Sequence, residues 1–209
     1  MYALSRNSFA SLTCLFLLSA CGGENKDSKP DQDAPLSATP STGIFLDSLV
    51  EGLKYETPTF SGTTNSAGEY DYMLGETVTF SIGDIVLGTV NAGPVVTPLT
   101  LVPNATDPTD PVVTNIVRLL LTLDDDGDPN NGISISSATS GTAAGLSVDF
   151  TAADLSADIG VSGLLSALPG SPTLVDATIA QTHFSETLAA QSTWGGMSWG
   201  SGTFRSVHL

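Results

Sequence analysis

An acidic loop in the middle of the chain has the residue types of a calcium site. Residues 124–132 read DDDGDPNNG, so aspartate and asparagine side chains recur along a segment whose glycines allow sharp turns. Ca²⁺ prefers such carboxylate and amide oxygens as ligands. The segment is not a regular EF-hand, because Pro129 occupies the position of the loop glycine and no glutamate closes the loop. We predict a Ca²⁺ site with four ligands: Asp124, Asp126, Asp128 and Asn130.

The position of this loop gives an electrostatic argument for a cation. The loop follows a predicted helix, Val112–Leu123, and the C-terminal end of a helix carries a partial negative charge. Exposed anions at such an end are unfavourable by about 0.3–1 kcal/mol each, and a bound cation would reverse that sign. The alternative is a solvated loop without metal, since aspartate and asparagine also favour turns by themselves.

A second motif, Gly196–Gly200, reads GMSWG and matches the G-x-S-x-G nucleophile elbow. That elbow needs a strand before it and a helix after it, and the flanking glycines and serines favour neither. His208 follows, but the tail after Gly200 is too short for the acid and the histidine of that fold. We therefore predict no catalytic residue. The alternative is a serine hydrolase or hydrolase remnant that rests on Ser198.

His183 and Glu186 lie three residues apart on another predicted helix, Thr173–Gln191. Such a pair could form part of a metal site. The only other histidine is His208, so a zinc site is not favoured. We predict that His183 is a surface or boundary residue.

The charge of the chain excludes one class of partner. The chain has 209 residues, with 22 Asp plus Glu against six Lys plus Arg, and a formal net charge of −16. A surface this acidic repels phosphate backbones, so we expect no nucleic-acid partner. Hydrophobic residues make up 41% of the chain, which favours a folded core over a wholly disordered acidic chain.

The N-terminus has the pattern of an export signal that ends in a lipid-attachment site. In residues 1–20, Arg6 precedes the apolar run Phe9–Leu18, which is too short to span a bilayer. The sequence LSAC at residues 18–21 resembles the lipobox of bacterial lipoproteins. That resemblance implies cleavage before Cys21 and a lipid on Cys21. The alternative is an ordinary signal peptide with an incidental cysteine.

The residues after this signal indicate a membrane tether. Under the lipoprotein resemblance, Gly22 in place of aspartate implies the outer membrane, on its periplasmic or its cell-surface side. Residues 21–42 are rich in Gly, Pro, Ser and Asp and have almost nothing to bury, which predicts a disordered linker. Cys14 would leave with the signal, so lipidation of Cys21 would leave the mature chain without a disulfide.

Residues 43–103 predict a β-rich module. Apolar and polar residues alternate with period two in short segments that turns separate about every ten residues. This spacing indicates an antiparallel β-sandwich-like module or a small barrel. Gly83-Asp84 predicts a tight hairpin turn between the last two strands. The expected strands are Gly43–Leu46, Gly52–Thr57, Thr59–Thr64, Glu69–Tyr72, Thr77–Ile82 and Ile85–Val90.

Residues 104–191 predict a helical segment, so the expected fold class is α+β. Asp110-Pro111 has the pattern of an N-cap followed by proline in the first turn of Val112–Leu123. Thr151–Asp154 resembles a capping-box start, and a short apolar turn follows at Gly160–Leu168. Buried stripes are expected at Val113, Ile116, Val117 and Leu120, widened by Leu119, Leu121 and Leu123, and at Ala177, Ala180, Phe184 and Leu188.

The tail, residues 192–209, is rich in Gly and Ser and has no clear period. Its aromatic residues are Trp194, Trp199 and Phe204. We expect these rings to pack back on the sheet; a platform for a sugar or peptide ligand is the alternative.

Turn glycines and strand residues between 43 and 102 resemble a known kind of module. Residues 62–80, GTTNSAGEYDYMLGETVTF, are similar to small β-sandwich modules of the carboxypeptidase-regulatory or transthyretin-like kind. The order of residues 43–190 also resembles modules of secreted lipoproteins and adhesin-like proteins of marine proteobacteria, in which a strand pair leads into a helix and an Asp-rich loop. These resemblances carry no catalytic residue. They imply a binding, spacer or regulatory module of undefined ligand. Together with the lipobox, we therefore expect a lipid-anchored, non-enzymatic envelope module with a scaffold, adhesion or ligand-binding role toward a protein or glycan partner.

Overall fold

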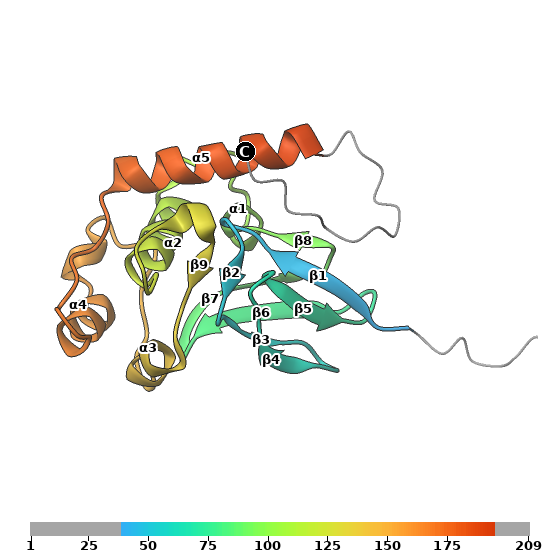
Figure 1. Ribbon diagram of the computed structural model, residues 1–209, viewed down its shortest axis with the longest axis horizontal. Helices are drawn as coiled ribbons and strands as arrows, with labels where there is room; N and C mark the ends of the chain where they lie inside the picture. Colours follow the sequence, from blue (N-terminus) through green and yellow to red (C-terminus); the bar gives the residue numbers. More distant parts are fainter. Residues whose placement is uncertain (1–38, 195–209) are drawn as a thin grey trace, which may run out of the picture. The chain divides into compact units, whose positions relative to one another are not determined.

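The computed structural model describes residues 39–194, and these form mixed sheets and helices around one set of buried side chains. Figure 1 shows the strands gathered on one side and helices α2 to α4 on the other, with α5 crossing α2. The strands are β1 (Ser41–Phe45), β2 (Val50–Glu51), β3 (Lys54–Glu56), β4 (Ser61–Thr63), β5 (Glu69–Tyr72), β6 (Thr77–Ile82), β7 (Ile85–Asn91), β8 (Val95–Val96) and β9 (Ile133–Ser134).

The largest sheet is antiparallel, with strand order β4-β3-β6-β7. Val78, Phe80 and Ile82 are buried on one face of β6, as the alternating pattern predicts. Gly83 turns the chain into β7 with φ of +56°, a conformation that favours glycine. The predicted hairpin 77–90 is therefore confirmed.

A second sheet has the order β5-β1-β8 and joins segments that are not consecutive in the chain. β1 pairs antiparallel with β5 and parallel with β8. Aromatic side chains connect this sheet with the larger one. The ring centroids of Phe45 and Phe80 lie 4.8 Å apart and those of Tyr70 and Phe80 lie 5.1 Å apart, both edge to face.

A short parallel pair, β2 with β9, brings the strand-rich part of the chain to the acidic loop. Val50 pairs with Ile133 and Glu51 with Ser134. Val50 and Ile133 are both buried and belong to the same core as the strands of the larger sheet and the helices. The two parts of the described chain thus share one hydrophobic core.

The helical part is built around α2. Its residues are Pro111–Thr122, which confirms the predicted helix to within one residue. Asp110 caps it by accepting hydrogen bonds from the backbone N–H groups of Val112 and Val113. The other helices are α1 (Pro98–Leu101), α3 (Ser137–Thr142), α4 (Ile159–Ala167) and α5 (Ala177–Trp194), with short 3₁₀ turns η1 (Pro129–Asn131) and η2 (Leu155–Ala157).

Two local predictions in the helical part were wrong. Thr151 does not begin a helix, because its N–H and hydroxyl bond back to Asp149, and Asp154 caps only the short turn η2. The segment Gly160–Leu168 is not an apolar turn but the helix α4, which Asp158 caps by accepting from Val161 N–H. Asp149 thus competes for the groups that would start a helix at Thr151, whereas Asp158 supplies the N-cap that starts α4.

The described chain confirms the α+β class. The stripe on α5 is confirmed at Ala180 and Phe184, which are fully buried, and Leu188 packs against the same core. Among residues 39–194, none of the helices combines the length and the apolar character that a membrane crossing requires.

Candidate functional site

The acidic loop joins the end of α2 to β9, and backbone hydrogen bonds hold its two ends together. Leu123 ends the helix by donating to the carbonyls of Leu119 and Leu120. Asp125 N–H then donates to Ser134 O at 2.9 Å, and Ser134 N–H donates to Asp124 Oδ1 at 2.9 Å. Ser134, at the end of the loop, is therefore bonded to Asp124 and Asp125 at its start, and these bonds hold the acidic side chains in one region.

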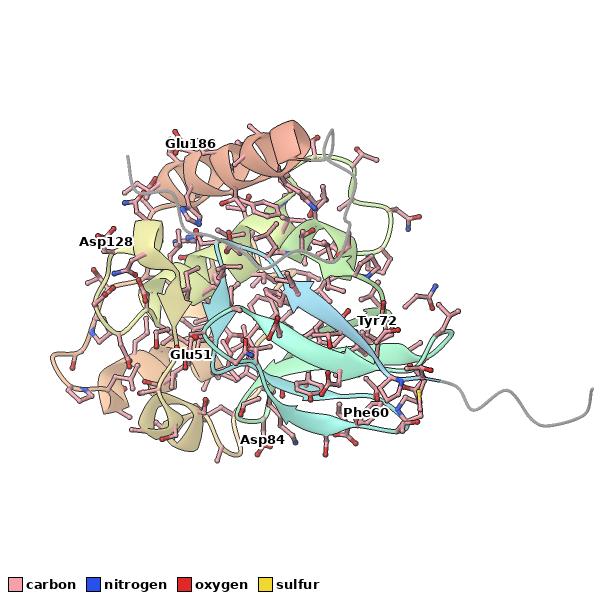
Figure 2. All side chains as sticks on the ribbon, turned by 45° about the vertical axis from the view of Figure 1, so that its right-hand side comes forward. Glu51, Phe60, Tyr72, Asp84, Asp128 and Glu186 are labelled. Atoms are coloured by element: carbon pink, nitrogen blue, oxygen red, sulfur yellow. The ribbon has the colours of Figure 1, made fainter. Side chains whose placement is uncertain are left out.

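The predicted ligands in the exposed part of the loop are engaged with their neighbours. Asp126 accepts from Asp128 N–H at 2.9 Å and from the Asn131 side-chain amide at 2.8 Å. Asp128 Oδ1 accepts from the backbone N–H and the side-chain amide of Asn130. The Asn131 and Asp128 donors lower the pKa of Asp126, and the adjacent Asp124 carboxyl acts in the same direction. Figure 2 shows Asp128 at the edge of the molecule.

Asp124 differs from the other three predicted ligands because it is buried. Its side chain is 9% exposed, and Oδ2 has no hydrogen-bond partner among the described residues. Burial raises the pKa of Asp124, the hydrogen bond from Ser134 opposes this, and the charges of Asp126, Asp125 and Asp128 raise it further. A buried carboxylate oxygen without a donor is unfavourable unless a proton or a cation compensates it.

The structure brings Asp124 to Asp126 but does not gather all four predicted ligands. Within the described ranges, no group of three or more His, Cys, Asp or Glu side chains is close enough to hold a metal ion. Asn130 donates its amide to Asp128, which leaves its carbonyl oxygen free to serve a cation. Ca²⁺ binding by all four residues would therefore require these side chains to move closer together.

A cleft of about 580 Å³ lies beside the loop, between the end of α2, α3 and the end of α4. Asp124 and Asp125 are its acidic lining residues, and no basic side chain lines it. The lining hydroxyl groups already have partners: Thr122 donates to Arg118 O, and Thr142 donates to Ala138 O. The cleft is acidic, and its other lining residues are a mixture of apolar and hydroxyl-bearing side chains.

A second group of interest, which the sequence analysis did not identify, is a buried pair of Asp47 and His183. Asp47 lies in the turn after β1 and is 0% exposed. His183 Nε2 lies 3.2 Å from Asp47 Oδ1, and the His183 side chain is 15% exposed. The contact has the distance of an ion pair, which it forms when His183 is protonated and Asp47 is ionised. It is not an aligned hydrogen bond, since neither carboxylate oxygen nor Nε2 has a hydrogen-bond partner in residues 39–194.

The pair shifts the titration of both groups. Burial raises the pKa of Asp47, and His183 offsets this only in part. Burial acts to lower the pKa of His183, but the Asp47 carboxylate, with a smaller effect of Glu186, raises it above its ordinary value. His183 is half-buried, which agrees with the predicted boundary position, but its fully buried partner Asp47 was not predicted. The only signal in the sequence was Asp47 at the end of a strand-like run.

Several predicted features lie outside the described residues. These are the lipid-attachment residue Cys21, the tether, and the tail with Ser198 and His208. The side chain of Trp194 is also outside this description.

Comparison of this chain with protein-family models, with curated proteins and with solved structures found no match.

Proposed function

We propose that this chain is a lipid-anchored, non-enzymatic module of the bacterial cell envelope that binds Ca²⁺ at its Asp-rich loop. The proposal places the chain at the outer membrane, with the folded part in a scaffold, adhesion or ligand-binding role toward a protein or glycan. The facing aromatic rings of β1, β5 and β6 support a β-sandwich-like arrangement of the two larger sheets.

The observation that carries the calcium part is the environment of Asp124. Its Oδ2 atom is buried without a hydrogen-bond partner among residues 39–194, and its carboxyl group interacts electrostatically with that of Asp126. Neighbouring carboxyl groups favour a proton or a cation that reduces their repulsion. Ca²⁺ also suits the flanking groups, since Asp128 and Asn130 supply further oxygen atoms and the negative end of α2 points at the loop.

Calcium should raise the melting temperature of the folded part. At a Ca²⁺ concentration one hundredfold above its Kd, binding stabilises the native state by about 2.7 kcal/mol. For a domain of this size we expect Tm to rise by roughly 5–10 °C relative to a chelator. Calorimetry with Ca²⁺, Mg²⁺ or chelator measures the shift directly.

Variants make this test specific to the loop. Asp124→Asn keeps an acceptor for Ser134 N–H and gains a donor toward Asp126, so it should fold but lose the response to Ca²⁺. Glu56→Gln removes the same charge from an exposed position on β3 and should respond like the wild type. Identical melting curves of the wild-type protein in Ca²⁺ and in chelator would show that the loop is a solvated turn.

Loss of Cys21 should abolish lipid attachment. In a Gram-negative host given labelled palmitate, we expect label in the wild-type protein and its recovery with the outer membrane. Cys21→Ser should carry no label, whereas Cys14→Ser, which changes a cysteine inside the predicted signal, should be labelled normally. Equal labelling of Cys21→Ser and the wild type would contradict the anchor.

The non-enzymatic part of the proposal is tested by an ester-hydrolysis assay. An activity of the wild-type protein that Ser198→Ala abolishes would favour the hydrolase alternative instead.

A further inference from the structure

The buried pair of Asp47 and His183 connects two distant parts of the chain. Asp47 belongs to the turn that follows β1, where Leu46 and Leu49 form a bridge and Ser48 adopts a positive φ of 56°. His183 lies in the first half of α5. The pair therefore fixes the last described helix to the first strand through a contact of 3.2 Å.

Besides this pair, α5 is attached by apolar packing against α2 and the core, to which Leu188 contributes. Among the described side chains of α5, Ala180 and Phe184 are fully buried, and Gln181 donates to the Thr114 hydroxyl of α2 at 3.1 Å. Thr182, Ser185 and Glu186 are exposed, and Figure 2 shows Glu186 on the outward side of the helix. The Asp47–His183 contact thus adds a charged, titratable contact to the apolar packing of α5.

No second cation compensates Asp47 within the described residues. On α2 the only charged side chain is Arg118, which donates to Val175 O and to Asn115 Oδ1. The segment of β8 and α1 that borders the turn, residues 95–101, has no charged residue, and Glu51 on β2 is exposed. On α5 itself, Glu186 is the other titratable side chain that acts on His183.

We propose that the Asp47–His183 pair is a pH-sensitive latch that holds α5 against the sheets while the pair carries its proton and loosens α5 when that proton is lost. With the proton, the pair is neutral overall and its burial is tolerated. Without it, an uncompensated carboxylate remains in a fully buried position, which strongly favours conformations that admit water. Because His183 of α5 contacts Asp47, displacement of α5 would expose Asp47 to water.

The direction of the effect follows from linkage. His183 has a raised pKa in the closed state, so the closed state keeps a proton that the open state releases once the pH exceeds about 6.5. The stabilisation is complete below that pH and is lost as the pH rises to the pKa of His183 in the closed state. The pKa of Asp47 is also raised in the closed state, so Asp47 likewise stabilises the closed state at low pH and loses this effect as the pH rises.

Amide hydrogen exchange of α5 between pH 5.5 and 9, corrected for the intrinsic rate, tests the latch. We expect the opening constant of α5 to increase up to tenfold per pH unit above about pH 6.5 and then to level off, while β6 and β7 change little. Asp47→Asn removes the carboxylate, so its α5 should show no such increase. Glu186→Gln removes a charge that has a smaller effect on the pKa of His183, so this variant should keep most of the pH-dependent increase in α5 opening.

Two results would overturn the latch. In one, protection of α5 in the wild-type protein is constant across this pH range. In the other, α5 and the β6–β7 hairpin lose protection in parallel, which would mean that the pair stabilises the whole fold. If Asp47→Asn does not fold, the double variant Asp47→Asn/His183→Gln provides the comparison, because it removes both titrating groups.

Discussion

Replacing His183 with alanine should lower the free energy of unfolding by about 3 kcal/mol at pH 6 and by much less at pH 4. The change removes the partner of a carboxylate that is 0% exposed. Breaking a buried ion pair in this way typically costs about 3–5 kcal/mol, because the remaining charge is uncompensated. While α5 stays in place, Asp47 can escape that cost only by taking up a proton, which at pH 6 costs about 3 kcal/mol for a group with an ordinary pKa near 3.8.

Urea denaturation of the wild type and the variant at the two pH values measures this difference. The double variant Asp47→Asn/His183→Ala is the control, since it has no buried charge and should show almost the same loss at both pH values. A loss for His183→Ala that does not depend on pH would mean that the histidine contributes packing alone.

Local sequence patterns were sufficient for elements whose partners lie nearby in the chain. The alternation in β6 and β7 and the turn at Gly83 predicted the hairpin, and the apolar stripe with its Asp110-Pro111 start predicted α2. The parallel pairs β1–β8 and β2–β9 were not predicted, because no local period records which distant segment a two-residue strand will meet.

The same distinction applies to the candidate sites. Composition alone located the acidic loop, because its aspartates and asparagines are contiguous. The buried state of Asp124 depends on Ser134, ten residues away, and the partner of Asp47 is on the last described helix. A buried polar group is recognised only when the tertiary contacts that bury it are known.

The short β2–β9 pair links the acidic loop to the sheets, and Gly52 lies at its edge. The φ of Gly52 is +87°, its N–H donates to Thr64 O, and a Cβ at this position would lie 2.0 Å from the carbonyl oxygen of Ile135. Ile135 in turn donates to Glu51 O, so that carbonyl is held by backbone contacts and not by a flexible side chain. The structure therefore requires glycine at position 52 for two separate reasons.

Gly52→Ala should lower the free energy of unfolding by about 3–5 kcal/mol, from backbone strain at positive φ and from the contact with Ile135. Gly75→Ala is the matched control: its φ is +91°, but a Cβ there meets nothing within 4 Å, so we expect only the strain, about 1–2 kcal/mol. Urea denaturation measures the free energy of unfolding of both variants, and the difference between their losses is the contribution of the contact with Ile135. Equal losses would mean that the chain at Ile135 moves aside freely, and that the β2–β9 junction does not hold the acidic loop rigidly against the sheets.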